Sequence, residues 1–244
     1  MKVCLFDSCI GGISLLCECV QRLPDTDFIY FADNYNVPYG SLSAEKITQL
    51  TFCAFEQIAK EQPDAVAVAC NTVTAVCIDK LRAFYPFKIF GIQPAVKPAA
   101  KNSKNCIVLA TPKTSESAQM TKLVQSFGEG RTRVLPCAQL AAHIEDNIFN
   151  IEESAVLNLL PDTVADGVVL GCTHYSFVKD IIAKKYGCAV YDGAEGTAEN
   201  LKRFISCLSV IASPKGKISF KSGNYDKNRQ VFEKYFPLFN KHNI

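Results

Sequence analysis

Two cysteines occupy matching positions in the chain, 102 residues apart. Cys70 ends the stretch VAVAC, Cys172 ends the stretch VVLGC, and small polar residues follow each one. In both cases an apolar run typical of a buried strand is followed by a segment with the pattern of a helix. A thiol at a helix N-terminus lies near unpaired N–H groups, which are expected to lower its pKa. Two such thiols could exchange protons with one ligand from opposite sides.

Other roles for the two cysteines stay open at this point. A cysteine most often packs as a small buried apolar side chain. Cys172 with His174 could belong to a nucleophilic cysteine hydrolase, although that reading leaves Cys70 without a role. The two cysteines could also form a redox pair, but they do not make a C-x-x-C motif. That motif occurs nowhere in the chain, so the sequence predicts no metal site.

The composition describes an ordinary globular protein. Nearly half of the residues are apolar, a fifth are charged, and the formal net charge is +2. This charge implies no attraction to nucleic acid or to an acidic membrane surface. Charged residues interrupt every apolar run before it could span a membrane, and MKVCLFDSC enters a strand pattern without the features of a signal peptide. With twelve cysteines, we therefore expect free thiols and a cytoplasmic location.

Short apolar runs alternate with longer amphipathic stretches, which predicts an α/β fold with mostly parallel sheets. The apolar runs predict strands at residues 2–7, 27–32, 65–69, 88–92, 105–110, 132–136, 166–170, 188–191 and 217–222. The amphipathic stretches predict helices at residues 12–22, 43–61, 73–85, 115–127, 138–147, 175–186, 195–208 and 226–235.

The offset of 102 residues also aligns VCLFDSCIGGIS at 3–14 with NCIVLATPKTSE at 105–116. In both stretches an apolar strand leads into small and polar residues before a helix. We expect two similar α/β domains related by a pseudo-twofold axis, with a ligand bound in the cleft at the carboxyl ends of their strands. The chain is predicted to pass from the first domain to the second at GIQPAVKPAA, residues 91–100, and to return in the segment 205–217. The first domain then comprises residues 1–92 and 206–244, and the second comprises residues 93–205.

Six short motifs resemble, in order, those of glutamate racemase, one of the cofactor-independent amino-acid racemases. The resemblance runs from the first strand to about residue 200, which is most of the chain. The motifs are DSCIGG at 7–12, DNYNVPYG at 33–40, ACNT at 69–72, GIQPAVKPA at 91–99, ATPKTSES at 110–117 and GCTHYS at 171–176.

The resemblance implies an isomerase that interconverts L- and D-glutamate without a cofactor and supplies D-glutamate for bacterial peptidoglycan, and so for cell wall biogenesis and cell shape. Cys70 and Cys172 match its two acid/base cysteines. Asp7 matches a residue that assists the nearer cysteine, and His174 and Glu145 match residues that support the second. The residues implied to contact the substrate are Ser8, Tyr39, Gly40, Asn71, Thr72, Thr111, Thr114 and Thr173.

Several of these residues also have a purely structural interpretation. Asp7 could cap a helix, as could Thr111 and, in particular, Thr114. Tyr39 and its neighbour Gly40 could belong to a turn after a proline, and Glu145 could be a solvated helix residue.

One position departs from the resemblance. Cys9 stands where the family usually has glycine, in the loop expected to approach the substrate. A side chain there would strain the backbone if the position requires a positive φ. The Cys9 side chain also adds a third thiol near the expected site, and oxidation of this thiol could affect the site.

Two other functions stay open. A racemase of the same superfamily could act on aspartate or another amino acid, and a non-catalytic amino-acid-binding paralogue could keep the same scaffold. A homodimer is a possible assembly, and glutamate is the expected small-molecule partner.

Overall fold

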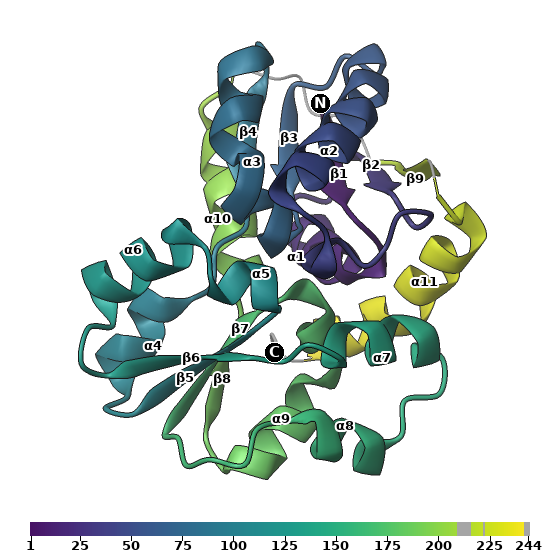
Figure 1. The fold of residues 1–244 in the computed structure, drawn as a ribbon. Helices are drawn as coiled ribbons and strands as arrows, with labels where there is room; N and C mark the ends of the chain where they lie inside the picture. Colours follow the sequence, from purple (N-terminus) through teal and green to yellow (C-terminus); the bar gives the residue numbers. More distant parts are fainter. Residues whose placement is uncertain (209–215, 222, 242–244) are drawn as a thin grey trace.

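Two parallel β-sheets form the framework of the chain (Figure 1). The structure is a computed structural model that describes residues 1–208, 216–221 and 223–241. The first sheet has the strand order β4 (Lys88–Gly91), β3 (Ala65–Val68), β1 (Lys2–Asp7), β2 (Asp27–Ala32) and β9 (Ile218–Lys221). The second has the order β6 (Thr132–Pro136), β5 (Cys106–Ala110), β7 (Gly167–Gly171) and β8 (Ala189–Tyr191). Every pairing between these described strands is parallel, which confirms the predicted fold class.

The two sheets repeat one arrangement of strands. β1 lies between β3 and β2 in the first sheet, and β5 lies between β7 and β6 in the second. Val3 pairs with Ala65 in the first sheet, and Cys106 pairs with Gly167 in the second. The stretches aligned by the offset of 102 residues are therefore equivalent central strands, and the two predicted catalytic cysteines follow β3 and β7.

The central strands are buried because helices cover their sheets. β3, β5 and β7 consist of small and aliphatic residues and are buried along their whole length. Such continuous apolar runs are typical of parallel strands covered on both faces. Around the first sheet lie α1 (Ile13–Arg22), α2 (Ala44–Lys60), α3 (Asn71–Phe84), α10 (Gly193–Ser206) and α11 (Tyr225–Lys241). Around the second lie α4 (Val96–Asn102), α5 (Pro112–Ser115), α6 (Ala118–Phe127), α7 (Leu140–Asn147), α8 (Glu153–Leu159) and α9 (Lys179–Tyr186).

Three short 3-10 helices lie at the strand ends that face the other half of the chain. They are η1 (Ile10–Gly12) after β1, η2 (Tyr39–Ser41) after β2 and η3 (Thr173–Val178) after β7. η1 packs against η3, and η2 packs against α5. These contacts bring together loops that are far apart in the sequence.

The predicted helices differ from the structure in three places. The predicted helix 115–127 corresponds to α6, which begins only at Ala118 because Ser117 caps it by accepting a hydrogen bond from the N–H of Met120, and the short helix α5 precedes it. The predicted helix 175–186 begins as η3 and becomes α-helical only at Lys179. α4 and α8 were not predicted. α4 tolerates Pro98 because the proline lies in its first turn, where an N–H has no helical partner.

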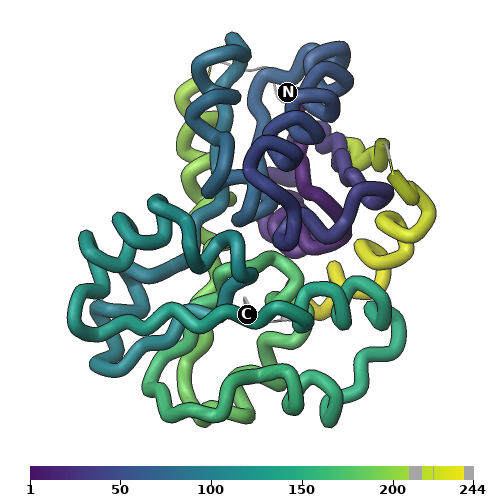
Figure 2. The backbone as a smooth tube through the Cα atoms, in the orientation of Figure 1, coloured from purple at the N-terminus to yellow at the C-terminus, as the bar shows by residue number. Residues whose placement is uncertain are grey.

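The helices near the C-terminus connect the two halves of the chain. α10 follows β8 of the second sheet but packs against α1 and β4 of the first. α11 runs from β9 toward α7, as the yellow segment of the tube shows (Figure 2), and Tyr235 donates a hydrogen bond of 2.8 Å to the carbonyl of Ile148. The predicted crossing at 205–217 includes residues 209–215, which lie outside the described residues. We propose from the packing of α10 that the second crossing instead lies near Asp192.

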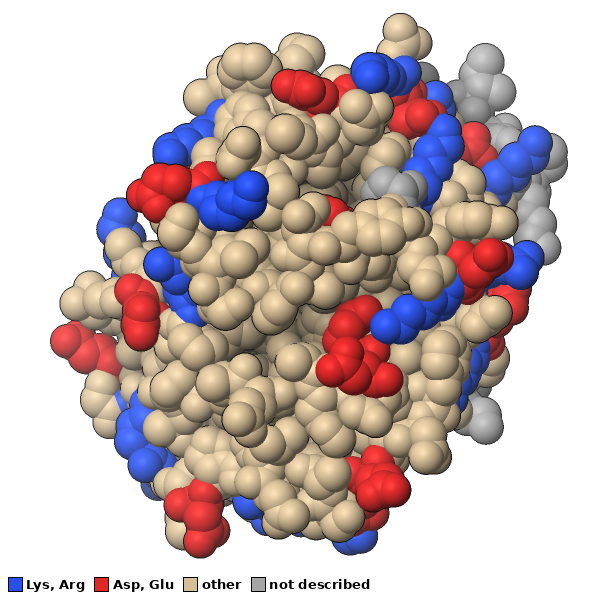
Figure 3. Space-filling view, turned by 45° about the vertical axis from the view of Figure 1, so that its right-hand side comes forward, with Lys and Arg blue, Asp and Glu red and all other residues tan. Residues whose placement is uncertain are grey.

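Charged side chains of both signs are interspersed over the face shown in Figure 3, without a broad patch of one sign. None of the helices in the described part of the chain is both long enough and apolar enough to cross a membrane.

Candidate active site

Cys70 lies at the N-terminus of α3, two residues after the buried strand β3 ends, and its side chain is buried. Ser8, at the end of β1, places its Oγ 3.6 Å from Cys70 Sγ. The same hydroxyl donates a hydrogen bond of 3.2 Å to Asp7 Oδ1. Because β1 and β3 are neighbours, their carboxyl ends bring these residues into a chain of contacts from the thiol through a hydroxyl to a carboxylate.

Cys172 lies at the N-terminus of η3, directly after β7, and has a different partner. Its Sγ is 3.6 Å from Nδ1 of His174. The other ring nitrogen, Nε2, is 3.0 Å from Oε2 of Glu145, which α7 provides. Both side chains are nearly buried, with 6% and 10% exposure. The thiol, imidazole and carboxylate therefore form a second chain of contacts.

The two chains of contacts meet at Asp7. Thr173, next to Cys172, donates a hydrogen bond of 3.1 Å to Asp7 Oδ2. The backbone N–H of Cys9 donates to the other oxygen, Oδ1, at 3.1 Å. Gly11 lies close to this junction, since a Cβ there would lie 2.4 Å from Thr173 Oγ1. The approach of η1 to η3 thus requires glycine at this position.

Three threonine hydroxyls form a second bridge between the halves. Thr72, on α3, has its Oγ1 3.3 Å from that of Thr111 and 3.2 Å from that of Thr114. Thr111 donates a hydrogen bond of 3.0 Å to Thr114 Oγ1. Thr111 also caps α5, accepting the N–H of Thr114. The expectation that Thr114 in particular is the cap is therefore wrong, because α5 begins earlier than the predicted helix.

The remaining residues predicted to contact the substrate differ in whether their polar groups already have a hydrogen-bond partner. Tyr39 is 1% exposed and donates a hydrogen bond of 2.7 Å to Asp33, so its hydroxyl already has a partner. Gly40 lies against Thr111, where a Cβ would come within 3.0 Å of the threonine Cβ. Asn71 is buried, and its Oδ1 has no hydrogen-bond partner among the described residues. That oxygen is available to accept a hydrogen bond from a ligand.

Cys9 adds a third thiol to the site without straining the backbone. Its φ is −158°, so the position does not require glycine. Cys9 Sγ lies 3.3 Å from Nε2 of His174 and 3.5 Å from Ser8 Oγ. The side chain is 4% exposed. Cys9 therefore contacts residues of both chains of contacts.

The surroundings of the two cysteines also differ in charge. Burial raises the pKa of Cys70 well above its ordinary value, and the nearby carboxylate of Asp7 adds to the rise. A hydrogen bond with the Val73 N–H opposes it. The expectation that the helix N-terminus lowers the pKa of Cys70 is therefore wrong, because burial outweighs the N–H groups. Asp7 is itself a buried carboxyl whose pKa is raised by burial.

On the other side, His174 and Glu145 form an ion pair. Burial alone would lower the pKa of His174, but Cys9, Cys172 and Glu145 outweigh it and raise that pKa well above its ordinary value. Burial alone would raise the pKa of Glu145, but His174 and Lys227 outweigh it and lower that pKa to about 2. The proton of this pair therefore belongs to the imidazole.

The model of the family described as Asp/Glu/Hydantoin racemase matches residues 14–201. The chain belongs to this racemase family.

Two curated members of the family are close relatives over most of their length. The glutamate racemase of Clostridium novyi (strain NT) is 38% identical, with 83% of each chain covered. The protein named glutamate racemase 2 of Bacillus subtilis (strain 168) is 34% identical, with 98% of this chain and 95% of that protein covered. Among solved structures, the glutamate racemase isoform RacE1 of Bacillus anthracis is similar with a TM-score of 0.84 and 25% identity, covering 97% of this chain and 94% of that one.

Lys227 is a site residue that the sequence analysis missed. It lies on α11, and its Nζ donates hydrogen bonds of 2.9 Å to both Oε1 and the carbonyl oxygen of Glu145. The two residues are 82 positions apart, and Lys227 lies beyond the last racemase motif. Its place on the amphipathic helix 226–235 gave no signal that distinguishes it from the other lysine of that helix, Lys234.

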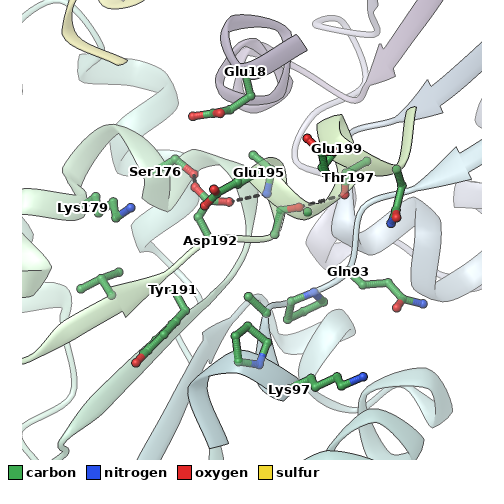
Figure 4. A pocket seen from close by; sticks show the side chains of 18 of the residues that line it. Glu18, Gln93, Lys97, Ser176, Lys179, Tyr191, Asp192, Glu195, Thr197 and Glu199 are labelled. Atoms are coloured by element: carbon green, nitrogen blue, oxygen red, sulfur yellow. Dashed lines mark hydrogen bonds between the residues drawn. The ribbon is translucent and has the colours of Figure 1, made fainter. Parts of the chain in front are cut away.

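A cavity of about 1030 Å³ lies away from these groups, beside the crossing between the halves (Figure 4). Its lining includes Glu18, Gln93, Lys97, Asp192 and Glu195. Ser176, in η3, also lines it and donates a hydrogen bond to Asp192. None of the predicted catalytic or substrate residues lines this cavity, so its size does not locate the chemistry.

Proposed function

We propose that this racemase interconverts L- and D-glutamate, with Cys70 and Cys172 transferring protons on opposite faces of the α-carbon. Its relatives, which it matches over most of their length and which are named glutamate racemases, support the reaction and the substrate. The observation that carries the mechanism is that the two thiols have different partners, Ser8–Asp7 at Cys70 and His174–Glu145 at Cys172. A two-base reaction requires one thiol to donate a proton while the other, as a thiolate, accepts one, and different partners at the two cysteines favour this difference.

In one direction, a thiolate at Cys172 takes the α-proton and the thiol of Cys70 donates its proton to the opposite face. An imidazolium at His174 can hydrogen-bond a thiolate at Cys172 through Nδ1, and Glu145 stabilises the imidazolium. The raised pKa of Cys70 suits the acid, because the thiol keeps its proton until the carbanion-like state develops. The proton count of the enzyme and substrate is unchanged, and the cysteines exchange roles in the reverse direction.

Unpaired polar groups around the cysteines provide a site for the amino acid. Asn71 Oδ1 can accept a hydrogen bond from the substrate ammonium. The N–H groups at the start of α3 favour a carboxylate. Three hydroxyls hydrogen-bond to one another across the two halves, those of Thr72, Thr111 and Thr114. Each hydroxyl can rotate to donate a hydrogen bond to a substrate carboxylate oxygen instead. Substrate entry then requires these bridges to open.

The reaction fits a reducing compartment. All twelve cysteines are free thiols, and most are buried. We place the protein in the cytoplasm, where thiols stay reduced, and there D-glutamate would supply peptidoglycan synthesis, as the resemblance implies.

The test is racemisation of L-glutamate followed by circular dichroism, in H₂O and in D₂O. Cys70→Ala and Cys172→Ala should each lower kcat by at least about 100-fold, the usual contribution of a positioned acid or base. Cys53→Ala, at an exposed thiol on α2, should change it less than about twofold. The wild-type product should carry deuterium at the α-carbon.

Retention of activity in either active-site variant would contradict the two-thiol mechanism. Turnover of aspartate without turnover of glutamate would contradict the substrate. Binding of glutamate in calorimetry without any turnover by the wild type would identify a binding protein instead of an enzyme.

A further inference from the structure

Cys9, His174 and Glu145 gather three metal-binding atoms at one buried point. Cys9 Sγ is 3.3 Å from His174 Nε2, and that nitrogen is 3.0 Å from Glu145 Oε2. The three potential ligand atoms all lie within 4.8 Å of one another, and all three residues are buried. They come from the N-terminus of η1, from η3 and from α7, so the site exists only when the two halves of the chain meet.

We propose that Cys9, His174 and Glu145 bind one Zn²⁺ ion, with water in the fourth position. Thiolate, imidazole and carboxylate are the three ligand types that zinc uses, and three protein ligands with one open position is a common zinc arrangement. The mixed sulfur, nitrogen and oxygen set favours zinc over Mg²⁺ or Ca²⁺, which bind oxygen ligands.

The spacing of the three atoms fits an ion with small adjustments. Zinc binds sulfur at about 2.3 Å and nitrogen or oxygen at about 2.0–2.2 Å, which separates tetrahedral ligands by roughly 3.4–3.6 Å. The contact of Cys9 with His174 is 3.3 Å and that of His174 with Glu145 is 3.0 Å. Each of these two pairs therefore has to separate by only a few tenths of an ångström, while the third pair, Cys9 Sγ with the Glu145 oxygen, lies within 4.8 Å.

The neighbouring groups suit a bound cation. The thiolate of Cys9 and the carboxylate of Glu145 would balance the charge of the ion. Lys227 hydrogen-bonds Oε1 of Glu145, so Oε2 can coordinate while the lysine keeps its contact. Such hydrogen bonds orient metal ligands. Coordination releases the thiol proton of Cys9 and the Nε2 proton of His174 to solvent, and the ring then keeps its remaining proton on Nδ1, facing Cys172 Sγ at 3.6 Å.

Zinc binding would inhibit racemisation, a consequence that rests on the proposed function. With Nε2 on the ion, His174 is held as a neutral donor and loses its contact with Glu145. It can then no longer form the imidazolium that pairs with a thiolate at Cys172. The ligand that Cys9 supplies depends on this chain's own sequence, because the resembling family usually has glycine there.

The test uses the full-length, reduced and metal-free protein, titrated with Zn²⁺ in a calorimeter and with Co²⁺ in a spectrophotometer. Cys53→Ser/Cys207→Ser serves as the background because it removes the two exposed thiols. We expect one equivalent of tightly bound Zn²⁺ in this background and a sulfur-to-Co²⁺ charge-transfer band. Adding Cys9→Gly should remove the band and raise Kd at least about 100-fold.

Further variants separate this site from other thiol sites. Cys172→Ala and Cys70→Ala should keep the band, since neither thiol is a proposed ligand. The proposed function predicts that Cys172→Ala is inactive, so metal binding to this variant is measured independently of catalysis. Glu145→Gln should raise Kd even if Cys9→Gly fails to fold, with far-ultraviolet circular dichroism as the folding check. A band that survives Cys9→Gly, that is lost in Cys172→Ala, or that never forms in the background would overturn the proposal.

Discussion

Lys227 provides a sharp test of how the C-terminal helix supports the site. In Lys227→Met the apolar part of the side chain is kept, while the charge and both hydrogen bonds to Glu145 are lost. The two side chains are 25% and 10% exposed. Hydrogen bonds to charged groups contribute about 1.5–3 kcal/mol, and removal of one partner of a fully buried pair costs about 3–5 kcal/mol. Because Lys227 is partly hydrated and His174 still pairs with Glu145, we expect a loss of about 2 kcal/mol.

Urea unfolding followed by circular dichroism measures this loss as a lower midpoint with an unchanged m-value. For a chain of this size, about 2 kcal/mol corresponds to a decrease in Tm of roughly 4–8 °C. Lys184→Met is the matched control. Lys184 pairs with Glu153 at 2.6 Å, but these side chains are 74% and 46% exposed. Such exposed pairs contribute little, so we expect a change below about 0.5 kcal/mol.

Lys227→Met should also lower kcat several-fold, because Glu145 would no longer be fixed against His174. The lysine acts through Glu145 and touches no reacting atom, so the loss should be smaller than in the cysteine variants. Equal stability losses in Lys227→Met and Lys184→Met would refute the reasoning, because burial would then not set the strength of the pair.

Two further substitutions test the contacts between η1 and η3. Thr173→Val removes the donor to the buried carboxylate of Asp7, so we expect a loss of about 1.5–3 kcal/mol in urea unfolding. Thr173→Ser keeps the hydroxyl and should recover most of the lost free energy of unfolding. A Thr173→Val variant as stable as wild type would contradict a stabilising role for this hydrogen bond. Gly11→Ala places a Cβ within 2.4 Å of Thr173 Oγ1, and a displacement of about 1 Å there should lower kcat/KM roughly 100-fold. Gly196→Ala, with nothing near its Cβ, should leave kcat/KM unchanged.

The sheets could be predicted from the sequence because each strand is short, apolar and bounded by polar residues. The predicted strand 65–69 is β3 (Ala65–Val68), and the predicted strand 166–170 is β7 (Gly167–Gly171). Helices with a weak hydrophobic periodicity were harder to predict from the sequence. α8 is a seven-residue helix in which Val156 is the one buried side chain, so its periodicity is weak.

The partners of the site residues could be predicted only in part. The motifs place Asp7, Ser8 and Cys70 near one another because they follow neighbouring parallel strands. The contacts of Glu145 with Lys227, and of Cys9 with His174, depend on how the two halves and the last helix pack. Neither contact has a sequence spacing that could reveal it.

The electrostatics of the Cys70 thiol follow from burial more than from the helix end. Both cysteines begin a helical segment, as the sequence predicts, but at Cys70 burial and a neighbouring carboxylate dominate and favour the thiol. Cys172 instead contacts a histidine whose proton is held by Glu145. A reaction that removes a proton from one face of a carbon and adds another to the opposite face requires this difference, because two thiols in the same state could not act as acid and base together. The hydrogen bond of Thr173 to Asp7 joins the two environments in one network across the halves of the chain.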